Sequence, residues 1–204
     1  MRRLALVLVL GLAVALAGCN KGGDGPAAPA GPSKEEQLKT FQEKVLPQVQ
    51  AAVPADAPKV EFEAKLTDKD TAIAAVPKGW KESVIPGTFE PPEGSDIPFM
   101  TQYGVGSNCD GSCSPKDWKA TAEKVEFAQF KDPQFKIEKD EALKDPEGRL
   151  LVASVDEGKK LYIVAARWKE GASRYYTCRA TLVDKATALR PAVERACVLN
   201  IPLF

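Results

Sequence analysis

The side chains of this sequence that most clearly carry chemistry are its 5 cysteines, because none of its 204 residues is histidine. Without histidine, Ser–His and Cys–His nucleophilic systems and His-ligated zinc sites are excluded. The many carboxylates are compatible with paired-carboxylate hydrolysis, although no Asp or Glu pair stands out by its spacing. No phosphate-binding, nucleotide-binding or calcium-binding pattern occurs, so the sequence predicts no cofactor and no metal.

The charge balance argues against nucleic acid as a partner. The chain has 28 Lys and Arg residues and 28 Asp and Glu residues. Removing residues 1–18, which hold two arginines, leaves 26 basic and 28 acidic residues, a net charge of −2. A near-neutral chain without a basic stripe lacks the attraction that phosphate backbones need.

Cys19 ends an N-terminal segment with the pattern of an export signal. Two arginines precede an uncharged apolar run over residues 4–17, which is shorter than the roughly 20 residues that span a bilayer. Leu16-Ala17-Gly18-Cys19 resembles the lipobox of bacterial lipoproteins, and the resemblance covers residues 1–19 only. It implies cleavage before Cys19, followed by acylation of the cysteine sulfur and of the new amino group.

An ordinary signal peptide, with Cys19 as a disulfide partner, is the alternative interpretation. Residues 20–33 favour the anchor, because their Gly, Pro and Ala content is typical of a flexible tether. Assigning Cys19 to lipid also leaves an even number of cysteines. In the best-known sorting rule for such lipoproteins, Asp after the cysteine favours inner-membrane retention. Asn20 stands there, so the resemblance implies the outer rather than the inner membrane.

These features divide the chain into three predicted parts: a signal peptide over 1–18, a lipidated tether over 19–33 and a single domain over 34–204. In the domain, a capping box at Ser33 and Glu36 predicts a helix with a stripe from Leu38 to Val53, which Pro47 should kink or end near Leu46. Alternation predicts strands over 59–66 and 97–105, with loops and one short strand over 67–96.

A second helix should begin after Ser114, with Pro115 at its first position, and end near Phe130. Its buried stripe is expected to hold Trp118, Thr121, Ala122 and Val125. A short strand is expected over 133–138, and three antiparallel strands over 149–155, 160–168 and 173–183. Residues 184–199 should be helical, with a new segment at Pro191. The fold class is therefore α+β, an antiparallel β-meander with packed helices, stabilised by disulfides.

Four cysteines allow three pairings, and the predicted elements favour one of them. Cys178 on the last long strand and Cys197 on the apolar stripe of the last helix would pin that helix to the sheet. Cys109 and Cys113 would then close the CDGSC loop. The alternative is a redox-active pair at Cys109 and Cys113, although three residues separate them where the usual redox motif has two.

The candidate binding surface is one face of the meander. Tyr162, Trp168 and Tyr175 should share this face, with Arg174 nearby, and an open aromatic surface of this kind suits a protein partner. The other interpretation is that the N-terminal helices cover it. A second candidate is the loop over 104–114, which carries Asp110, because rigid loop tips often carry recognition.

Together these features predict a lipid-anchored protein of the cell envelope, whose periplasmic domain binds another protein as an inhibitor, immunity factor or assembly subunit. Its partners would be the membrane, through the lipid on Cys19, and a protein of the envelope. Two alternatives are a carboxylate-dependent hydrolase acting on cell-wall or glycan material and a small-ligand carrier. The missing catalytic residues favour a protein that is not an enzyme.

Overall fold

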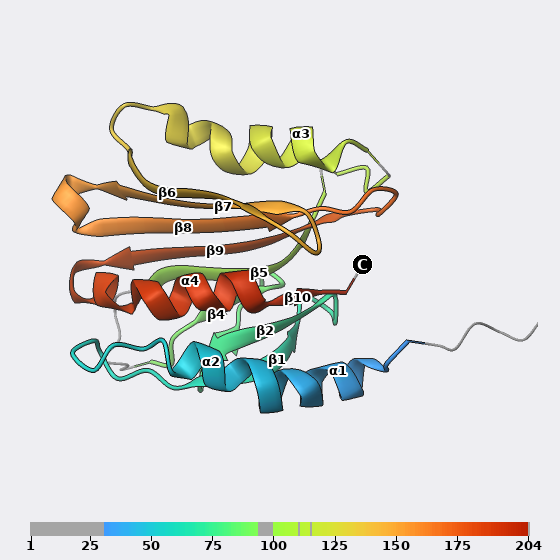
Figure 1. Ribbon diagram of the computed structural model, residues 1–204, viewed down its shortest axis with the longest axis horizontal. Helices are drawn as coiled ribbons and strands as arrows, with labels where there is room; N and C mark the ends of the chain where they lie inside the picture. The colour runs from blue at the N-terminus through green and yellow to red at the C-terminus, as the bar shows by residue number, and fades with distance from the viewer. Residues whose placement is uncertain (1–30, 94–99, 110, 115, 204) are drawn as a thin grey trace, which may run out of the picture. The chain divides into compact units, whose positions relative to one another are not determined.

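The computed structural model describes residues 31–93, 100–109, 111–114 and 116–203, and residues 32–204 form one compact unit (Figure 1). Among the described residues, one antiparallel sheet has seven strands in the order β3-β4-β5-β9-β8-β7-β6, and another has three in the order β1-β2-β10. The predicted α+β class with an antiparallel meander is confirmed.

The larger sheet contains β3 (Lys81–Glu82), β4 (Thr88–Glu90), β5 (Met100–Asn108), β6 (Lys136–Leu143), β7 (Gly148–Val155), β8 (Lys160–Arg167) and β9 (Tyr175–Val183). The smaller sheet contains β1 (Phe62–Thr67), β2 (Ala72–Pro77) and β10 (Ile201–Pro202). Strands β6 to β9 are consecutive hairpins, and β5 returns to pair with β9. The meander is thus longer than the three strands predicted.

In the pairing of β8 with β9, Ala165 lies opposite Cys178 and Ala166 lies opposite Thr177, so alternate residues point to the two faces of the larger sheet. We call one the core face; it carries Leu161, Ile163, Ala165, Cys178 and Leu182. We call the other the α3 face; it carries Tyr162, Val164, Ala166, Trp168 and Tyr175. Each face belongs to a separate hydrophobic cluster.

The core face is covered by helix α4 (Arg190–Leu199), which follows the helical turn η5 (Asp184–Leu189). Pro191 begins the new segment, as predicted. α4 packs against β8 and β9 on one side and against β2 and α2 (Leu46–Gln50) on the other. The Cys178–Cys197 disulfide joins α4 to β9, and Cys109–Cys113 closes the short loop, so the predicted pairing is confirmed.

The α3 face is covered by α3 (Trp118–Ala122), η2 (Glu123–Phe127) and η3 (Ala128–Lys131), at the top of Figure 1. The N-terminal helices lie elsewhere: α1 (Lys34–Thr40), η1 (Phe41–Val45) and α2 pack on the smaller sheet. The idea that they cover the α3 face is therefore wrong. The segment from α3 to η3 comes directly before β6 in the chain, and this short connection keeps it next to the α3 face.

The α3 segment begins at a different residue than predicted, and different side chains of it face the sheet. Asp117, rather than Ser114, is the N-cap and accepts a hydrogen bond from the Ala120 amide, while Pro115 lies outside the described residues. η2 is a π-helical turn, which rotates later side chains relative to an α-helical pattern. Val125 is consequently 52% exposed, whereas Glu126 and Phe127 are buried.

The N-terminal helix forms the predicted capping box, with Ser33 and Glu36 bonding each other's amides. Of the two outcomes predicted at Pro47, the helix does not end near Leu46 but continues to Gln50, with an irregular turn before the proline. η1 is another π-helical turn, in which the Leu46 amide bonds Phe41 five residues back. This wide turn lies directly before Pro47. A regular α-helix would not accommodate the proline ring or its missing N–H, because both disturb the hydrogen bond to the preceding turn.

The stretch 67–96 contains more structure than predicted. β2 is buried along its whole length and pairs with both β1 and β10, and β3 and β4 add a short hairpin. β2 shows no alternation because both of its faces are covered. β1 begins at Phe62 rather than at residue 59, β5 extends to Asn108, and β6 runs to Leu143. Ile97 and Phe99 lie outside the described residues.

Candidate binding groove and pocket

The structure separates the residues of the predicted binding surface. Trp168 and Tyr175 are 7% and 1% exposed beneath α3, so they form no open surface. The ring of Tyr162 packs edge-on against Phe135, 5.4 Å between ring centroids. Arg174 alone among the described candidates is exposed. Asp110 lies outside the described residues.

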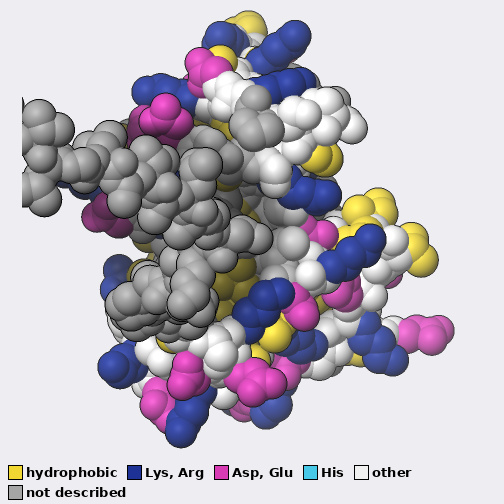
Figure 2. Space-filling view, turned by 90° about the vertical axis from the view of Figure 1, so that its right-hand side faces the viewer, with side chains coloured by type: hydrophobic (Ala, Val, Ile, Leu, Met, Phe, Trp, Pro, Cys, Tyr) yellow, Lys and Arg dark blue, Asp and Glu magenta, His cyan; other side chains and the backbone are white. Residues whose placement is uncertain are grey.

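One end of the domain, on the right of Figure 1, carries two adjoining hollows. There the β6–β7 turn and the β8–β9 loop meet the start of α3 and the end of α4. Figure 2 faces this end and shows basic and acidic side chains intermingled on it, with hydrophobic side chains between them. The side chains visible at this end therefore include apolar groups and charges of both signs.

The larger hollow, which we call the end groove, has a volume of about 1350 Å³ and is open to solvent. It is walled by residues 116–119, 144–147, 167–170 and 198–202. These segments contribute five Lys or Arg side chains and four Asp or Glu side chains. Two of the latter are already engaged: Asp117 caps α3, and Glu147 pairs with Lys119 at 3.3 Å.

Arg167 fixes two walls of the end groove. Its guanidinium is 5% exposed and donates to the carbonyls of Pro146 at 2.9 Å and Val198 at 2.6 Å. Val198 lies in the last turn of α4, where a helix end favours a cation. Within the described part of the chain, Arg167 contacts no carboxylate and its Nε has no hydrogen-bond partner. Burial lowers the pKa of this guanidinium. A buried cation held by carbonyls alone lacks an anion.

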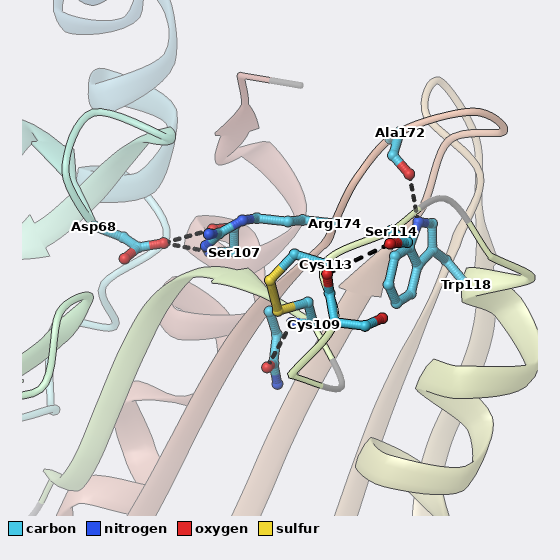
Figure 3. Close-up of a disulfide and its surroundings, with 10 residues drawn as sticks. Asp68, Ser107, Cys109, Cys113, Ser114, Trp118, Ala172 and Arg174 are labelled. Carbon is cyan, nitrogen blue, oxygen red and sulfur yellow. Dashed lines mark hydrogen bonds between the residues drawn. A yellow bond between two sulfur atoms is a disulfide. The ribbon is translucent and has the colours of Figure 1, made fainter.

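Two tryptophans stand where α3 begins. The Trp118 indole N–H donates to the Ala172 carbonyl at 2.6 Å and so ties α3 to the β8–β9 loop, as Figure 3 shows. The Trp118 and Tyr175 rings lie 5.7 Å apart between centroids. The indole N–H of Trp168 is buried and has no hydrogen-bond partner among the residues that the structure describes. These side chains hold the loop and helix that form the groove.

The smaller hollow, which we call the Tyr176 pocket, has a volume of about 440 Å³. It is lined by Thr71, Ser107, residues 169–174, Tyr176 and residues 202–203. It shares Lys169, Glu170 and Pro202 with the end groove, so the two hollows adjoin. These residues come from four distant parts of the chain, and no sequence pattern connects them.

A buried carboxylate organises one wall of the Tyr176 pocket. Oδ2 of Asp68 accepts from the Thr71 hydroxyl at 2.8 Å, from the Ser107 amide at 2.8 Å and from the Ser107 hydroxyl at 2.7 Å. Gly106 permits this approach, because a Cβ there would lie 2.9 Å from Asp68 Cβ. Arg174 donates to the Ser107 hydroxyl at 3.3 Å (Figure 3). The chain of contacts presents an oriented guanidinium beside the pocket.

Tyr176 lines the same pocket and is 1% exposed. Its hydroxyl is buried beside Asn200, Tyr103 and Arg167, none of which lines the pocket. Burial raises the pKa of this phenol well above its usual value, and Tyr103 in the same cluster is raised likewise. The Tyr176 hydroxyl therefore keeps its proton as a donor.

The buried carboxylates found in the described part of the chain are Asp68 and Glu126, and neither resembles a catalytic acid. Glu126 accepts from Arg179 through two nitrogens, from the Tyr175 hydroxyl at 2.8 Å and from Asn108 at 3.3 Å. Both carboxylates are thus occupied by donors within the protein. Sequence reasoning missed both, because an acidic residue in a turn or helix usually faces solvent.

Among exposed carboxylates, the resolved pKa shifts are downward. A hydrogen bond from Arg149 lowers the pKa of Asp140, and one from Ser154 lowers that of Glu138. Within the described ranges, no group of three His, Cys, Asp or Glu side chains is placed to hold a metal ion. No described helix is long and apolar enough to cross a membrane.

The geometry defines an α+β domain with two disulfides and an end-on groove. No family model and no curated protein sequence matches this chain.

Proposed function

We propose that the chain is a lipid-anchored protein of the cell envelope whose domain binds a protein partner through the end groove. The anchor is proposed from the lipobox-like Leu16-Ala17-Gly18-Cys19 and the Gly/Pro-rich stretch after it. Asn20 favours the outer membrane. Two disulfides support an oxidising compartment, because such bonds persist outside the cytosol.

The end groove is the observation that carries the binding role. Its volume of about 1350 Å³ exceeds the roughly 300–1000 Å³ typical of small-molecule sites. It is an open trough between four chain segments, a shape that suits a segment of polypeptide. Its walls mix a buried tryptophan with lysines and carboxylates, the combination of apolar contact and polar rim found at protein interfaces.

Photo-crosslinking in the native cell tests the groove. A photoreactive amino acid replaces Lys144 or Lys169, which are exposed at the groove, and as matched controls Lys124 or Lys131, which are exposed outside it. We expect one partner to crosslink from the two groove positions and from neither control. Equal crosslinking from all four positions would contradict the proposal.

The identified partner, once purified, gives a quantitative check. The double variant Lys144→Glu with Lys169→Glu should weaken its Kd by about tenfold. The matched double variant Lys124→Glu with Lys131→Glu should leave Kd within about twofold. A partner that binds both variants equally does not occupy the groove.

The anchor is tested by mass spectrometry of the N-terminal peptide of the membrane-extracted protein. We expect a peptide that begins at Cys19 and carries acyl chains, and no such peptide from Cys19→Ser. Asn20→Asp should move the protein from the outer-membrane to the inner-membrane fraction of a density gradient. An unmodified Cys19 in the mature protein would overturn the anchor.

A further inference from the structure

The loop between β3 and β4 presents the most exposed large apolar side chains found in the described ranges. Val84 is 100% exposed and Ile85 is 63% exposed, and Pro86 next to them is exposed as well. We call these three residues the 84–86 tip. Single exposed apolar residues are common on protein surfaces, whereas contiguous ones mark an interaction surface.

Hydrogen bonds within the loop fix the backbone of the tip. The Ser83 amide donates to the Thr88 carbonyl at 2.7 Å, and the Ile85 amide donates to the Ser83 hydroxyl at 3.1 Å. The Ile85 carbonyl accepts from the Thr88 amide at 3.0 Å. None of these bonds uses the side chain of Val84 or Ile85, and polar residues are the usual choice in turns. The fold therefore does not require apolar side chains at these positions.

The tip lies at the end of the domain to which the tether is attached. The Glu82 carboxylate accepts from the amides of Gly87 and Asp68, and Asp68 belongs to the turn between β1 and β2. Figure 1 shows this turn and the start of α1 at the same end, on the right. The tether ends at Ser33, the N-cap of α1. The tip and the attachment point of the tether are therefore at one end of the domain.

The length of the tether limits the distance between this end and the bilayer. If Cys19 carries the lipid, the 14 residues 20–33 separate the anchor from α1. Fourteen residues span at most about 50 Å when fully extended, which is close to the diameter of about 40 Å of a domain of this size. The tip then meets the bilayer at an effective concentration in the millimolar range. Under this condition a weak contact is sufficient.

The size and shape of the tip favour lipid over protein as its partner. A stable protein interface buries about 800 Å² on each side, far more than three residues supply. Insertion into a bilayer surface needs only protruding apolar side chains, and residues 83–87 include no charged side chain. The amide and carbonyl of Ile85 are already bonded, which lowers the cost of leaving water. Two aliphatic side chains bind a bilayer more weakly than one myristoyl chain, which is itself marginal, so the tip depends on the anchor.

We infer that the 84–86 tip inserts into the surface of the lipid bilayer and makes a second contact between the domain and the membrane. The inference rests on the proposed anchor, which brings the bilayer within reach. It goes beyond the anchor, because a lipid at the end of a flexible linker leaves the domain free to rotate. With the tip inserted, the end of the domain that carries the end groove lies close to the bilayer, and so does a partner bound there.

Photo-crosslinking of the full chain in its native cell tests the contact. A photoreactive amino acid replaces Val84 or Ile85, and in the matched control it replaces Val125, which is 52% exposed on η2. Mass spectrometry of the crosslinked peptides detects phospholipid adducts. We expect these adducts to be at least about tenfold more abundant from the tip than from Val125, because only the tip is held in the bilayer.

Three outcomes would overturn the inference. Equal lipid adducts from all three positions would show that the anchor alone brings lipid to the whole surface. Adducts with a protein in place of lipid at Val84 and Ile85 would assign the tip to a protein interface. The absence of any adduct from both tip positions would show that the tip stays in water.

A charged substitution connects the contact to the apolar side chains. With the photoreactive group kept at Ile85, Val84→Asp should lower the lipid adducts at least about tenfold, since a carboxylate is expelled from an apolar environment. The matched Val125→Asp should leave them unchanged. Val84→Asp should also keep the melting temperature within about 2 °C, because the side chain is fully exposed. A larger drop would show that Val84 packs within the protein and would contradict the inference.

The anchor and the tip fail separately. Mass spectrometry of the N-terminal peptide from the same sample reports whether Cys19 is acylated. An acylated Cys19 without lipid adducts at the tip leaves the anchor in place and overturns the inference. Lipid adducts at the tip of a chain whose Cys19 is unmodified support the tip and overturn the anchor.

Discussion

The two faces of the seven-stranded sheet are covered by different means. The core face packs against α4 and a second sheet, through a continuous apolar cluster closed by the Cys178–Cys197 disulfide. The α3 face packs against a single helical segment, through aromatic rings and a buried carboxylate, Glu126, paired with Arg179. One cover is held by a covalent bond and the other by side-chain contacts alone.

This difference indicates which layer opens first. Removing α4 requires breaking a disulfide and exposing the second sheet as well, whereas α3 is held by contacts of one segment with one face. Local opening follows the elements with the fewest buried contacts. We therefore expect hydrogen exchange to be faster in 118–131 than in 190–199, and the following changes test this order.

The largest expected effect concerns the apolar contacts of the α3 face. Phe127→Ala should lower the free energy of unfolding by about 3–5 kcal/mol, because it empties a fully buried ring site. Val125→Ala, two residues earlier and 52% exposed, should change it by less than about 0.5 kcal/mol. Urea denaturation measures both, and equal losses would contradict the phase that the π-helical turn gives to this segment.

The next effect concerns the core face. Replacing Cys178 and Cys197 by Ala should lower the free energy of unfolding by about 3 kcal/mol, since the disulfide closes a loop with a sequence separation of 19. The same replacement at Cys109 and Cys113, separated by 4, should cost about 2 kcal/mol. Urea denaturation under oxidising conditions provides the measurement. A larger loss from the short loop would mean that it, rather than α4, anchors the fold.

A third test removes the charged contact beneath η2. Glu126→Ala should lower the free energy of unfolding by about 2–3 kcal/mol. This is less than the loss on breaking a fully buried ion pair, because the Arg179 side chain is 36% exposed. Glu123→Ala, which affects the more exposed pair with Arg149, should cost less than about 1 kcal/mol. If the salt bridge serves the α3 cover, exchange in 118–131 should accelerate with Glu126→Ala while that of α4 stays unchanged.

The smallest effect is a pH dependence of the core face. Burial raises the pKa of Tyr103 and Tyr176 in the folded protein above the value near 10 of an exposed phenol. The stability from these protonated phenols is fully present below about pH 10 and is lost above it, by at most about 1.4 kcal/mol per group and pH unit.

The measurement follows urea midpoints above pH 10 together with phenolate absorbance. Ionisation of the two buried tyrosines should coincide with loss of the circular dichroism signal. The Tyr103→Phe, Tyr176→Phe double variant should show a shallower alkaline decline. Phenolate absorbance from both residues in a still folded protein would contradict their burial.

Much of this fold was predictable because its signals are local. The Ser33–Glu36 capping box follows from neighbouring residues. The Cys178–Cys197 disulfide followed from the apolar alternation of one strand and the apolar stripe of one helix, which left Cys109 and Cys113 as the second pair. β2 was missed because burial on both sides removes alternation, and Val125 was misplaced because a π-helical turn leaves no mark in an apolar pattern.

The candidate site was less predictable, since its residues meet only through the topology. Arg174 was identified, but Asp68 and Ser107, which orient it, stand 39 residues apart in the chain. A burial pattern locates a tyrosine inside the protein, but it does not show whether the hydroxyl finds a partner there. The residues around the Tyr176 hydroxyl became visible only with the three-dimensional contacts.

The last strand, β10, sets an order for the folding of a chain that emerges N-terminus first. Ile201 pairs with Ile73, and Asn200 accepts a hydrogen bond from the Ala75 amide, 125 residues away. The smaller sheet is therefore incomplete until residues 201–202 have left the ribosome, and until then one edge of β2 is unpaired. Such distant pairing slows folding. A nascent chain of this kind would need protection of that edge during synthesis, and a nonsense mutation before Asn200 would leave the edge permanently open.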